Sequence, residues 1–439
     1  MKLIEKYRHS PFRHEMSDVI WLLALKGLNY IAPILVLPYL MMTLGAEKYG
    51  YIGFSLAVCQ MMMLIVDFGF DLSATKEIAL AKGNQREVDR IYTETVRAKW
   101  LLLTVTALLV WALSMIPRFF IYRETLYVMF LMVVGHAFSF VWLLQGVGRI
   151  RVVSIINTLC KLSVLPLTFV FVHTPADFLV AALIQSMVYL LSSLVTYVYI
   201  QKKGLASSLP CSIQNVIMAL RRSFPIFFSN AATSIYTVSI AFFLGWFGTA
   251  VEVGRYSAVD RLVRALTYMI LFSVIQAFYP RIVQMNRENQ GVAVRYVRKV
   301  LVFVAGGMAL LGILLFAFSP LAESLLGTEY VGTGAIFRLM AWVPLFVGSG
   351  GVYAQLVLLA MGGERERRRY RNVYSLAAVL AFACIFLLIP VGKAMGAAGT
   401  VLIVEVFVAV GMAYCGHRLL FPRNAVSCNR SEENEINGK

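Results

Sequence analysis

The chain consists largely of apolar runs of about twenty residues, separated by short polar segments. A helix needs about 20 residues to cross the roughly 30 Å hydrocarbon core of a bilayer, whereas a typical soluble domain has about 25% charged residues. Here 59% of the 439 residues are hydrophobic and 14% are charged. Twelve runs approach or exceed the spanning length: residues 21–44, 51–66, 100–116, 126–144, 152–172, 178–200, 224–247, 256–279, 300–318, 335–361, 374–389 and 397–420. The sequence therefore excludes an ordinary soluble fold and predicts an all-α polytopic membrane protein with about 12 transmembrane helices.

Basic residues are distributed unequally between alternate loops. About 30 of the 40 lysines and arginines lie in the N-terminal segment, in the loops on the same side and in the C-terminal tail, with Lys99 in the first long loop of that side. The opposite loops carry about five: Lys48, Arg118, Arg123, Arg255 and Lys393. Because short cytoplasmic loops collect Lys and Arg, both termini are predicted to be cytoplasmic. Topology thus accounts for the net charge of +17, and nucleic acid is not expected as a partner.

The polar segment at residues 201–222 divides the spans into six and six. We therefore expect an N-terminal six-helix bundle (1–200), a cytoplasmic linker (201–222), a C-terminal six-helix bundle (223–422) and a polar cytoplasmic tail (423–439). A weak repeat supports this division, since Gly45 and Gly50 follow the first span of one half as Gly248 and Gly254 follow that of the other. Halves of equal orientation imply a pseudo-two-fold axis along the membrane normal and a central cavity that opens alternately to each side. This arrangement favours transport.

A motif after the second span resembles that of a known family. Residues 67–79, which include Asp67, Gly69, Thr75 and Lys76, resemble the signature loop of Wzx-type polysaccharide flippases. Residues 44–51 and 142–146 look like the same family. The chain departs from the family pattern after its Gln-Gly element, where Val147 stands in place of a frequent acidic residue.

The resemblance implies the fold of the multidrug, oligosaccharidyl-lipid and polysaccharide (MOP) exporter superfamily, with two six-helix bundles around a V-shaped cavity. It implies a bacterial cytoplasmic (inner) membrane location and no enzymatic activity or cofactor. The implied substrate is an undecaprenyl-diphosphate-linked oligosaccharide, moved from the cytoplasmic to the periplasmic leaflet by alternating access for O-antigen, capsule or exopolysaccharide assembly. The lipid bilayer, a glycan polymerase and a chain-length regulator are the other expected partners.

Basic residues within the predicted spans suggest where an anionic substrate binds. A Lys or Arg at the bilayer centre costs from about 2.5 kcal/mol upward, so such residues face the bundle interior or water, or extend from near a helix end. A diphosphate carries about two negative charges, which Arg and Lys can compensate. The predicted cationic cavity comprises Lys26, Lys161, Arg261 and Arg264. An alternative for Arg261 and Arg264 is that they pair with the adjacent Asp260. Arg338 lies near the periplasmic end of its span, and we expect its side chain to extend to the membrane surface.

Two acidic residues in the spans suggest ion coupling. Asp260 and Glu405 lie within apolar segments, where a carboxylate can bind a proton or cation during transport. Structural pairing with a basic residue explains them equally well. The six cysteines show no CxxC spacing, and the histidines show no ligand pattern, so neither disulfides nor a metal site is expected.

Two other functions remain open from the sequence. An ion-coupled drug or metabolite exporter of the same superfamily would favour an acidic and aromatic cavity over a basic one. A membrane glycan polymerase would need a sizeable extramembrane loop, and the longest loop on the less basic side covers only about residues 319–334. A purely structural scaffold is disfavoured by the two-half organisation and the charges within the spans.

Overall fold

The computed structural model describes residues 11–81, 83–326 and 328–421, with side chains described except at 11–34, 229–230, 232–236, 322, 324–326 and 328. Within these ranges the chain forms helices and no strands. The α-helices are α2 (Pro11–Asp67), α3 (Phe70–Leu80), α4 (Gln85–Ser114), α5 (Arg123–Ala137), α6 (Val141–Gly146), α7 (Ile150–Leu162), α8 (Val164–Phe171), α9 (Phe178–Lys202), α10 (Ile213–Phe247), α11 (Ala250–Glu288), α12 (Gln290–Leu326), α13 (Thr333–Met340), α14 (Val343–Val352) and α15 (Glu364–Leu420). Three 3-10 helices (Pro117–Tyr122, Pro175–Asp177 and Thr328–Tyr330) and a π-helical segment (Tyr353–Leu359) complete them. The expectation of an all-α membrane fold is confirmed.

Nine helical segments of the described residues are long and apolar enough to cross a membrane. The two longest helices, α2 and α15, each contain a break in helical geometry, at Gly45 (φ 74°) and Lys393 (φ 48°) respectively. Each therefore consists of two helices in succession, joined at the broken position. The exact count of twelve spans stays a prediction.

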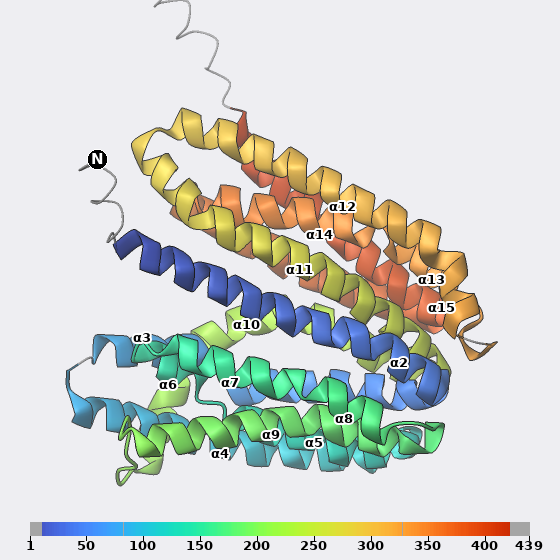
Figure 1. Cartoon of the computed structure of the whole chain (residues 1–439), viewed down its shortest axis with the longest axis horizontal. Helices are drawn as coiled ribbons and strands as arrows, with labels where there is room; N and C mark the ends of the chain where they lie inside the picture. Colours follow the sequence, from blue (N-terminus) through green and yellow to red (C-terminus); the bar gives the residue numbers. More distant parts are fainter. Residues whose placement is uncertain (1–10, 82, 327, 422–439) are drawn as a thin grey trace, which may run out of the picture.

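The helices form two groups with α2 running between them (Figure 1). One group contains α3 to α9, and the other contains α11 to α15. The α10 helix joins the groups, because it packs on α3 and α4 of the first and on α15 of the second. The α2 helix packs most extensively against α11 of the second group.

Glycines allow α2 and α11 to approach closely. A Cβ atom at Gly50 would overlap the carbonyl oxygen of Ala250, and one at Gly254 would overlap the carbonyl oxygen of Ala46. Each helix thus presents an Ala-x-x-x-Gly pair to the other, which is the small-residue spacing that lets membrane helices cross at close range. The contact is reciprocal and falls in the two segments that the sequence repeat relates.

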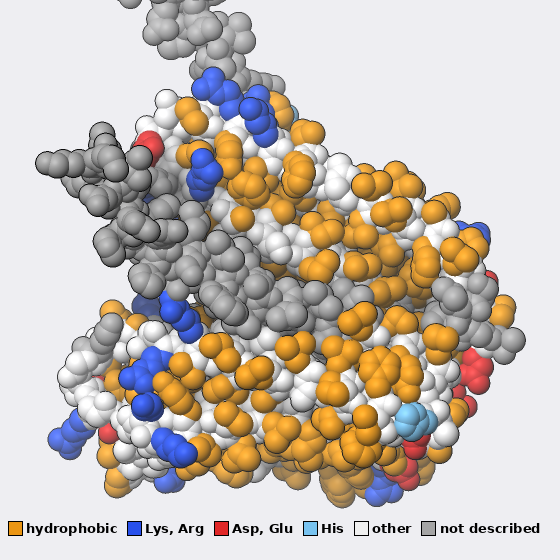
Figure 2. All heavy atoms as spheres, in the orientation of Figure 1, with side chains coloured by type: hydrophobic (Ala, Val, Ile, Leu, Met, Phe, Trp, Pro, Cys, Tyr) orange, Lys and Arg blue, Asp and Glu red, His pale blue; other side chains and the backbone are white. Residues whose placement is uncertain are grey.

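Figure 2 shows that the Lys and Arg side chains of the visible face gather mainly at one end of the molecule, and the first group, α2 and α10 pack together at the opposite end. There the ring of Phe54 in α2 lies 4.1 Å from that of Tyr122 and 5.8 Å from that of Phe242 in α10, measured between centroids. The Arg118 guanidinium donates hydrogen bonds to the carbonyl oxygens of Trp246 (3.2 Å) and Gly248 (2.7 Å). Aromatic packing and these hydrogen bonds hold this end together.

Candidate functional site

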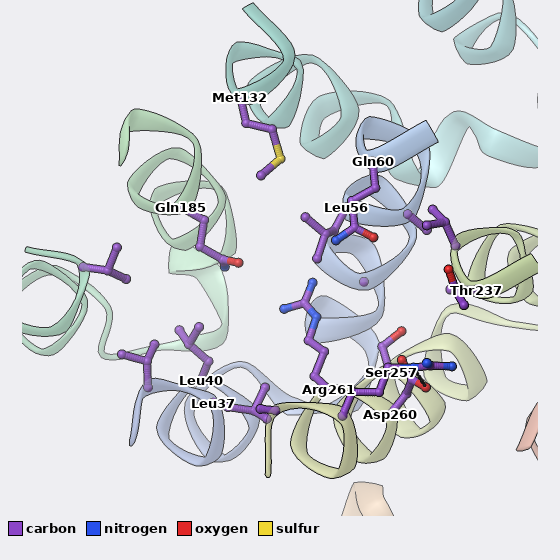
Figure 3. A pocket seen from close by; sticks show the side chains of 18 of the residues that line it. Leu37, Leu40, Leu56, Gln60, Met132, Gln185, Thr237, Ser257, Asp260 and Arg261 are labelled. Carbon is purple, nitrogen blue, oxygen red and sulfur yellow. Dashed lines mark hydrogen bonds and ion pairs between the residues drawn. The ribbon is translucent and has the colours of Figure 1, made fainter. Parts of the chain in front are cut away.

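A cavity of about 510 Å³ lies between the two groups of helices. It is lined by α2, α5, α7, α8 and α9 on one side and by α10 and α11 on the other (Figure 3). Most of its wall is apolar, including Leu37, Leu40, Leu56 and Met132. The sequence predicted a cavity in such a central position, while the pseudo-two-fold relation between the two halves stays a prediction.

Arg261 extends from α11 into this cavity (Figure 3). Its Nη1 atom donates a hydrogen bond of 3.0 Å to the Tyr49 hydroxyl, and its guanidinium carbon lies 5.5 Å from the centroid of that ring. Its Nη2 atom is buried and has no hydrogen-bond partner among the described residues. A buried donor without a partner is costly, and an anionic or hydrogen-bond-accepting group in the cavity would remove that cost.

Arg264 lies one turn further along α11 and is already paired. Its Nε atom lies 2.7 Å from Asp260 Oδ1, and its Nη1 atom lies 3.8 Å from Glu405 Oε1 in α15 and 3.3 Å from the Tyr268 hydroxyl. The side chains of Arg264 and Glu405 are 15% and 8% exposed, so the attraction is little screened by water. Asp260 therefore pairs with Arg264 rather than with Arg261.

The other two predicted cationic residues differ in what the structure shows. Lys161 of α7 lines the cavity, and no hydrogen bond or ion pair joins it to another described side chain. Lys26 belongs to α2, but its side chain lies outside the described part of the structure. Two further lining residues, Gln60 and Gln185, add neutral polar groups that the sequence analysis did not single out. The only feature of the sequence that could have indicated these two lining residues is the presence of a side-chain amide within an apolar span.

The motif that resembles the flippase signature loop begins at the C-terminal end of α2 and lies outside the cavity wall. Asp67 lies 3.4 Å from the ammonium group of Lys99, which is 2% exposed. Gly69 adopts φ 80° and leaves no room for a side chain, since a Cβ would lie 2.9 Å from the Phe227 nitrogen of α10. The Thr75 hydroxyl donates hydrogen bonds to two backbone carbonyls, one of them at Trp142 (3.1 Å). The motif thus joins α3 to its neighbours.

Three charged residues of the sequence analysis lie elsewhere. Lys76 is exposed on α3. Arg338 donates from Nε to the Ser319 hydroxyl at 3.1 Å and does not line the cavity. Lys99 was placed in a loop by its sequence position, whereas the structure buries it in α4. The one feature of the sequence that could have indicated the burial of Lys99 is the acidic residue at the end of the preceding span.

Two groups of membrane-spanning helices around a charged central cavity define a multi-pass membrane transporter. Residues 16–286 match the family described as "Polysaccharide biosynthesis protein". That match covers more than half of the chain, which therefore belongs to this family. The resemblance deduced from the loop motif is confirmed.

Comparisons with single proteins agree with this assignment. The chain is 29% identical over 411 residues to a protein of Escherichia coli (strain K12) named "Putative O-antigen transporter", covering 93% of this chain and 96% of that one. A relative of the same name from Shigella dysenteriae is 28% identical, covering 90% and 98%. Both relatives are named as transporters, so the expectation of a transporter rather than an enzyme is confirmed.

Solved structures share the fold. An inward-facing multidrug resistance MATE family transporter of the MOP superfamily has a TM-score of 0.67 at 15% identity, covering 91% of this chain and 94% of that one. The lipid II flippase MurJ in an inward closed conformation has a TM-score of 0.67 at 12% identity, covering 91% and 90%. At these identities the similarity establishes the MOP transporter fold.

Proposed function

We propose that this protein moves an undecaprenyl-diphosphate-linked oligosaccharide from the cytoplasmic to the periplasmic leaflet by alternating access. The observation that carries the proposal is the central cavity, into which Arg261 presents a buried guanidinium nitrogen that has no hydrogen-bond partner among the described residues. Membership of the polysaccharide biosynthesis family and the names of the relatives give the same direction. The product would serve O-antigen, capsule or exopolysaccharide assembly.

Charge supports an anionic substrate. Arg261 and Lys161 line the cavity and pair with no carboxylate of the described side chains, whereas the carboxylates of Asp260 and Glu405 both lie beside Arg264. A diphosphate needs cations where it leaves water, and Arg binds phosphate oxygens through two parallel hydrogen bonds. A cationic drug would instead need a free carboxylate, and neither Asp260 nor Glu405 provides one. The cavity therefore favours the flippase over the drug exporter.

The same proposal includes the orientation in the membrane. The basic loops would lie in the cytoplasm, both termini included, and the bacterial inner membrane would be the location. Ser207 between α9 and α10 and Glu124 at the start of α5 are exposed at opposite ends. In a chain without native cysteines, an impermeant thiol reagent added to intact cells should label Glu124→Cys and spare Ser207→Cys. The reverse pattern would refute this orientation.

We further propose that Asp260 and Glu405 couple transport to a proton or cation. Both carboxylates approach one guanidinium, Arg264, so protonation of either would weaken only part of the network. Binding of substrate beside Arg264 would compete with these carboxylates for the same cation. This competition offers a physical route from ion binding to substrate binding.

The central experiment changes the charge at Arg261. In a strain that lacks its own flippase, Arg261→Ala should reduce display of surface glycan, and Arg261→Lys should retain part of it. A hydrogen bond to a charged group is worth about 1.5–3 kcal/mol, which corresponds to a loss of roughly ten- to one-hundred-fold. Arg261→Gln separates charge from the hydrogen bond to Tyr49, because it keeps a donor and removes the charge.

Arg338→Ala is the matched control, since it removes an arginine from a membrane-spanning segment that does not line the cavity. Each variant is compared at equal protein level in the membrane. Normal display by both Arg261→Ala and Arg261→Gln would refute the cationic-cavity mechanism. Equal loss in Arg338→Ala would show that the effect is general to arginines in the membrane-spanning segments.

A further inference from the structure

A second, larger cavity of about 980 Å³ lies on the first group of helices. Its residues come from α4, α5 and α9, with Phe138 and Phe140 from the segment after α5 and Ser208 from the segment after α9. Figure 1 shows these helices on the side of the first group that is turned away from α11 to α15. The α5 helix packs against both α4 and α9, while α4 and α9 make few or no direct contacts. The cavity is therefore a groove with α5 as its floor and α4 and α9 as its walls.

The groove is separate from the central cavity. Tyr189 of α9 lines the central cavity, whereas the next residue, Leu190, lines the groove. The floor and wall are tightly joined, because a Cβ atom at Gly135 of α5 would lie 2.5 Å from the Leu190 nitrogen. A molecule in the groove is thus not on the proposed transport path.

The groove changes in character along its length. Toward the middle of the membrane it is lined by apolar side chains, including Val134, Leu190 and Leu194. Trp100 lies beside Phe138 there, with ring centroids 4.9 Å apart. Toward the basic loops it is lined by polar groups that include Gln201 and Ser208. Such a gradient matches a molecule with an apolar chain and a polar head.

Arg97 supplies a positive charge at the transition between these two parts. It is exposed, lines the groove, and forms no hydrogen bond or ion pair with another described residue. It lies 12 residues beyond the start of α4 at Gln85, and Trp100 lies one turn deeper, as expected of an aromatic residue near the membrane interface. The exposed Lys202 and Lys203 follow at the same end of α9. Basic pockets between membrane helices on the cytoplasmic side are the type of site that holds an anionic lipid headgroup.

We propose that this groove binds one anionic phospholipid from the leaflet beside the basic loops. Its phosphate pairs with Arg97, and an acyl chain lies over α5 between Trp100 and Leu194. Charge complementarity favours an anionic lipid headgroup, and the apolar walls favour the lipid's acyl chain. The site goes beyond the proposed transport function, because it occupies the outer face rather than the central cavity.

The full chain, purified in detergent and stripped of lipid, provides the test. Native mass spectrometry measures bound phosphatidylglycerol, with phosphatidylcholine of the same acyl chains as the neutral-head comparison. Wild-type protein should bind one phosphatidylglycerol at least ten-fold more tightly than phosphatidylcholine. Arg97→Gln should lose that preference, and Leu194→Trp should block binding by filling the groove while Arg97 remains.

Arg86→Gln is the matched control, because it removes an exposed arginine of α4 that does not line the groove. It should bind phosphatidylglycerol as the wild type does. Equal loss in Arg86→Gln and Arg97→Gln would indicate diffuse surface attraction and overturn the proposal. A mass corresponding to two chains without lipid, lost in Leu194→Trp, would show that the groove receives a second copy instead.

Discussion

The close crossing of α2 and α11 predicts that one added methyl group at Gly254 destabilises the protein. A Cβ at this position would overlap the Ala46 carbonyl oxygen, and it would lie 2.9 Å from the Ala46 carbonyl carbon and 3.1 Å from the Gly50 nitrogen. All of these obstacles are backbone atoms, which cannot rotate away as a side chain can. The two helices must therefore separate to accept alanine.

The expected magnitude follows from two opposing contributions. Inserting a methyl group into a well-packed interface typically costs about 1–3 kcal/mol, while replacing glycine by alanine in a helix gains up to about 1 kcal/mol. Gly306 in α12 provides the matched control, because a Cβ there would have no neighbour within 4 Å. The difference between Gly254→Ala and Gly306→Ala isolates the crossing and should be about 1–3 kcal/mol.

Thermal unfolding of the purified protein in one detergent measures this difference. Gly306→Ala should unfold at or above the wild-type temperature, and Gly254→Ala below it. Adding Gly50→Ala to Gly254→Ala should cost less than the sum of the two single changes, because the first change already separates the same helices. If Gly254→Ala unfolds at or above the temperature of Gly306→Ala, the close crossing is refuted.

Two further predictions concern the end away from the basic loops. Arg118→Ala removes the hydrogen bonds to the Trp246 and Gly248 carbonyls, so a Gln60→Cys probe in the cavity should react faster with an impermeant thiol reagent added from that side; an unchanged rate would contradict the closing role. Backbone amide hydrogen bonds hold the pKa of Asp177 below its ordinary value, so its stabilising contribution is present above about pH 4 and is lost as the pH falls through the lower pKa of the folded state. Asp177→Asn should therefore lower the unfolding temperature at neutral pH and lose this deficit in acid, as a series of unfolding temperatures against pH would show; a deficit independent of pH would contradict this.

The sequence predicted the helical fold because membrane-length apolar runs leave few alternatives. It also placed Lys161, Arg261 and Arg264 together, because charges in apolar spans must turn away from lipid. The repeat around Gly50 and Gly254 was visible as sequence similarity, but their direct contact was not. A sequence repeat indicates that two segments have similar surroundings. Only the folded structure shows that these two segments pack against each other.

Other features depend on contacts that no local pattern contains. The pairing of Arg264 with Glu405 joins residues 141 positions apart in the sequence. Lys99 was assigned to a loop because the apolar run begins immediately after it. In the structure Lys99 is buried and forms an ion pair with Asp67 from the end of the preceding span. The groove between α4 and α9 could not be predicted from the sequence, because its prediction requires knowing which helices do not pack against each other. Sequence periodicity identifies an apolar face but does not say whether a neighbouring helix covers it.

The balance of charge in the central cavity limits how the protein can work. Arg261, Arg264 and Lys161 contribute three positive charges, and Asp260 and Glu405 offset two of them when ionised. A cavity with several uncompensated cations would be costly to keep away from water without a substrate. The carboxylates reduce that cost, which under the proposed alternating access would let the empty transporter return between cycles.

This balance leaves the described cavity one positive charge short of the proposed diphosphate substrate, which would carry about two negative charges. Protonation of Asp260 or Glu405 would remove one negative charge and close the gap. Lys26 would close it equally well if its ammonium group enters the cavity. The two sources differ in their dependence on pH, because a lysine stays charged well above neutrality whereas a carboxylate gains its proton only as the pH falls. If a proton completes the charge match, transport by Lys26→Gln should persist and rise as the pH falls; if Lys26 completes it, the variant should be inactive throughout.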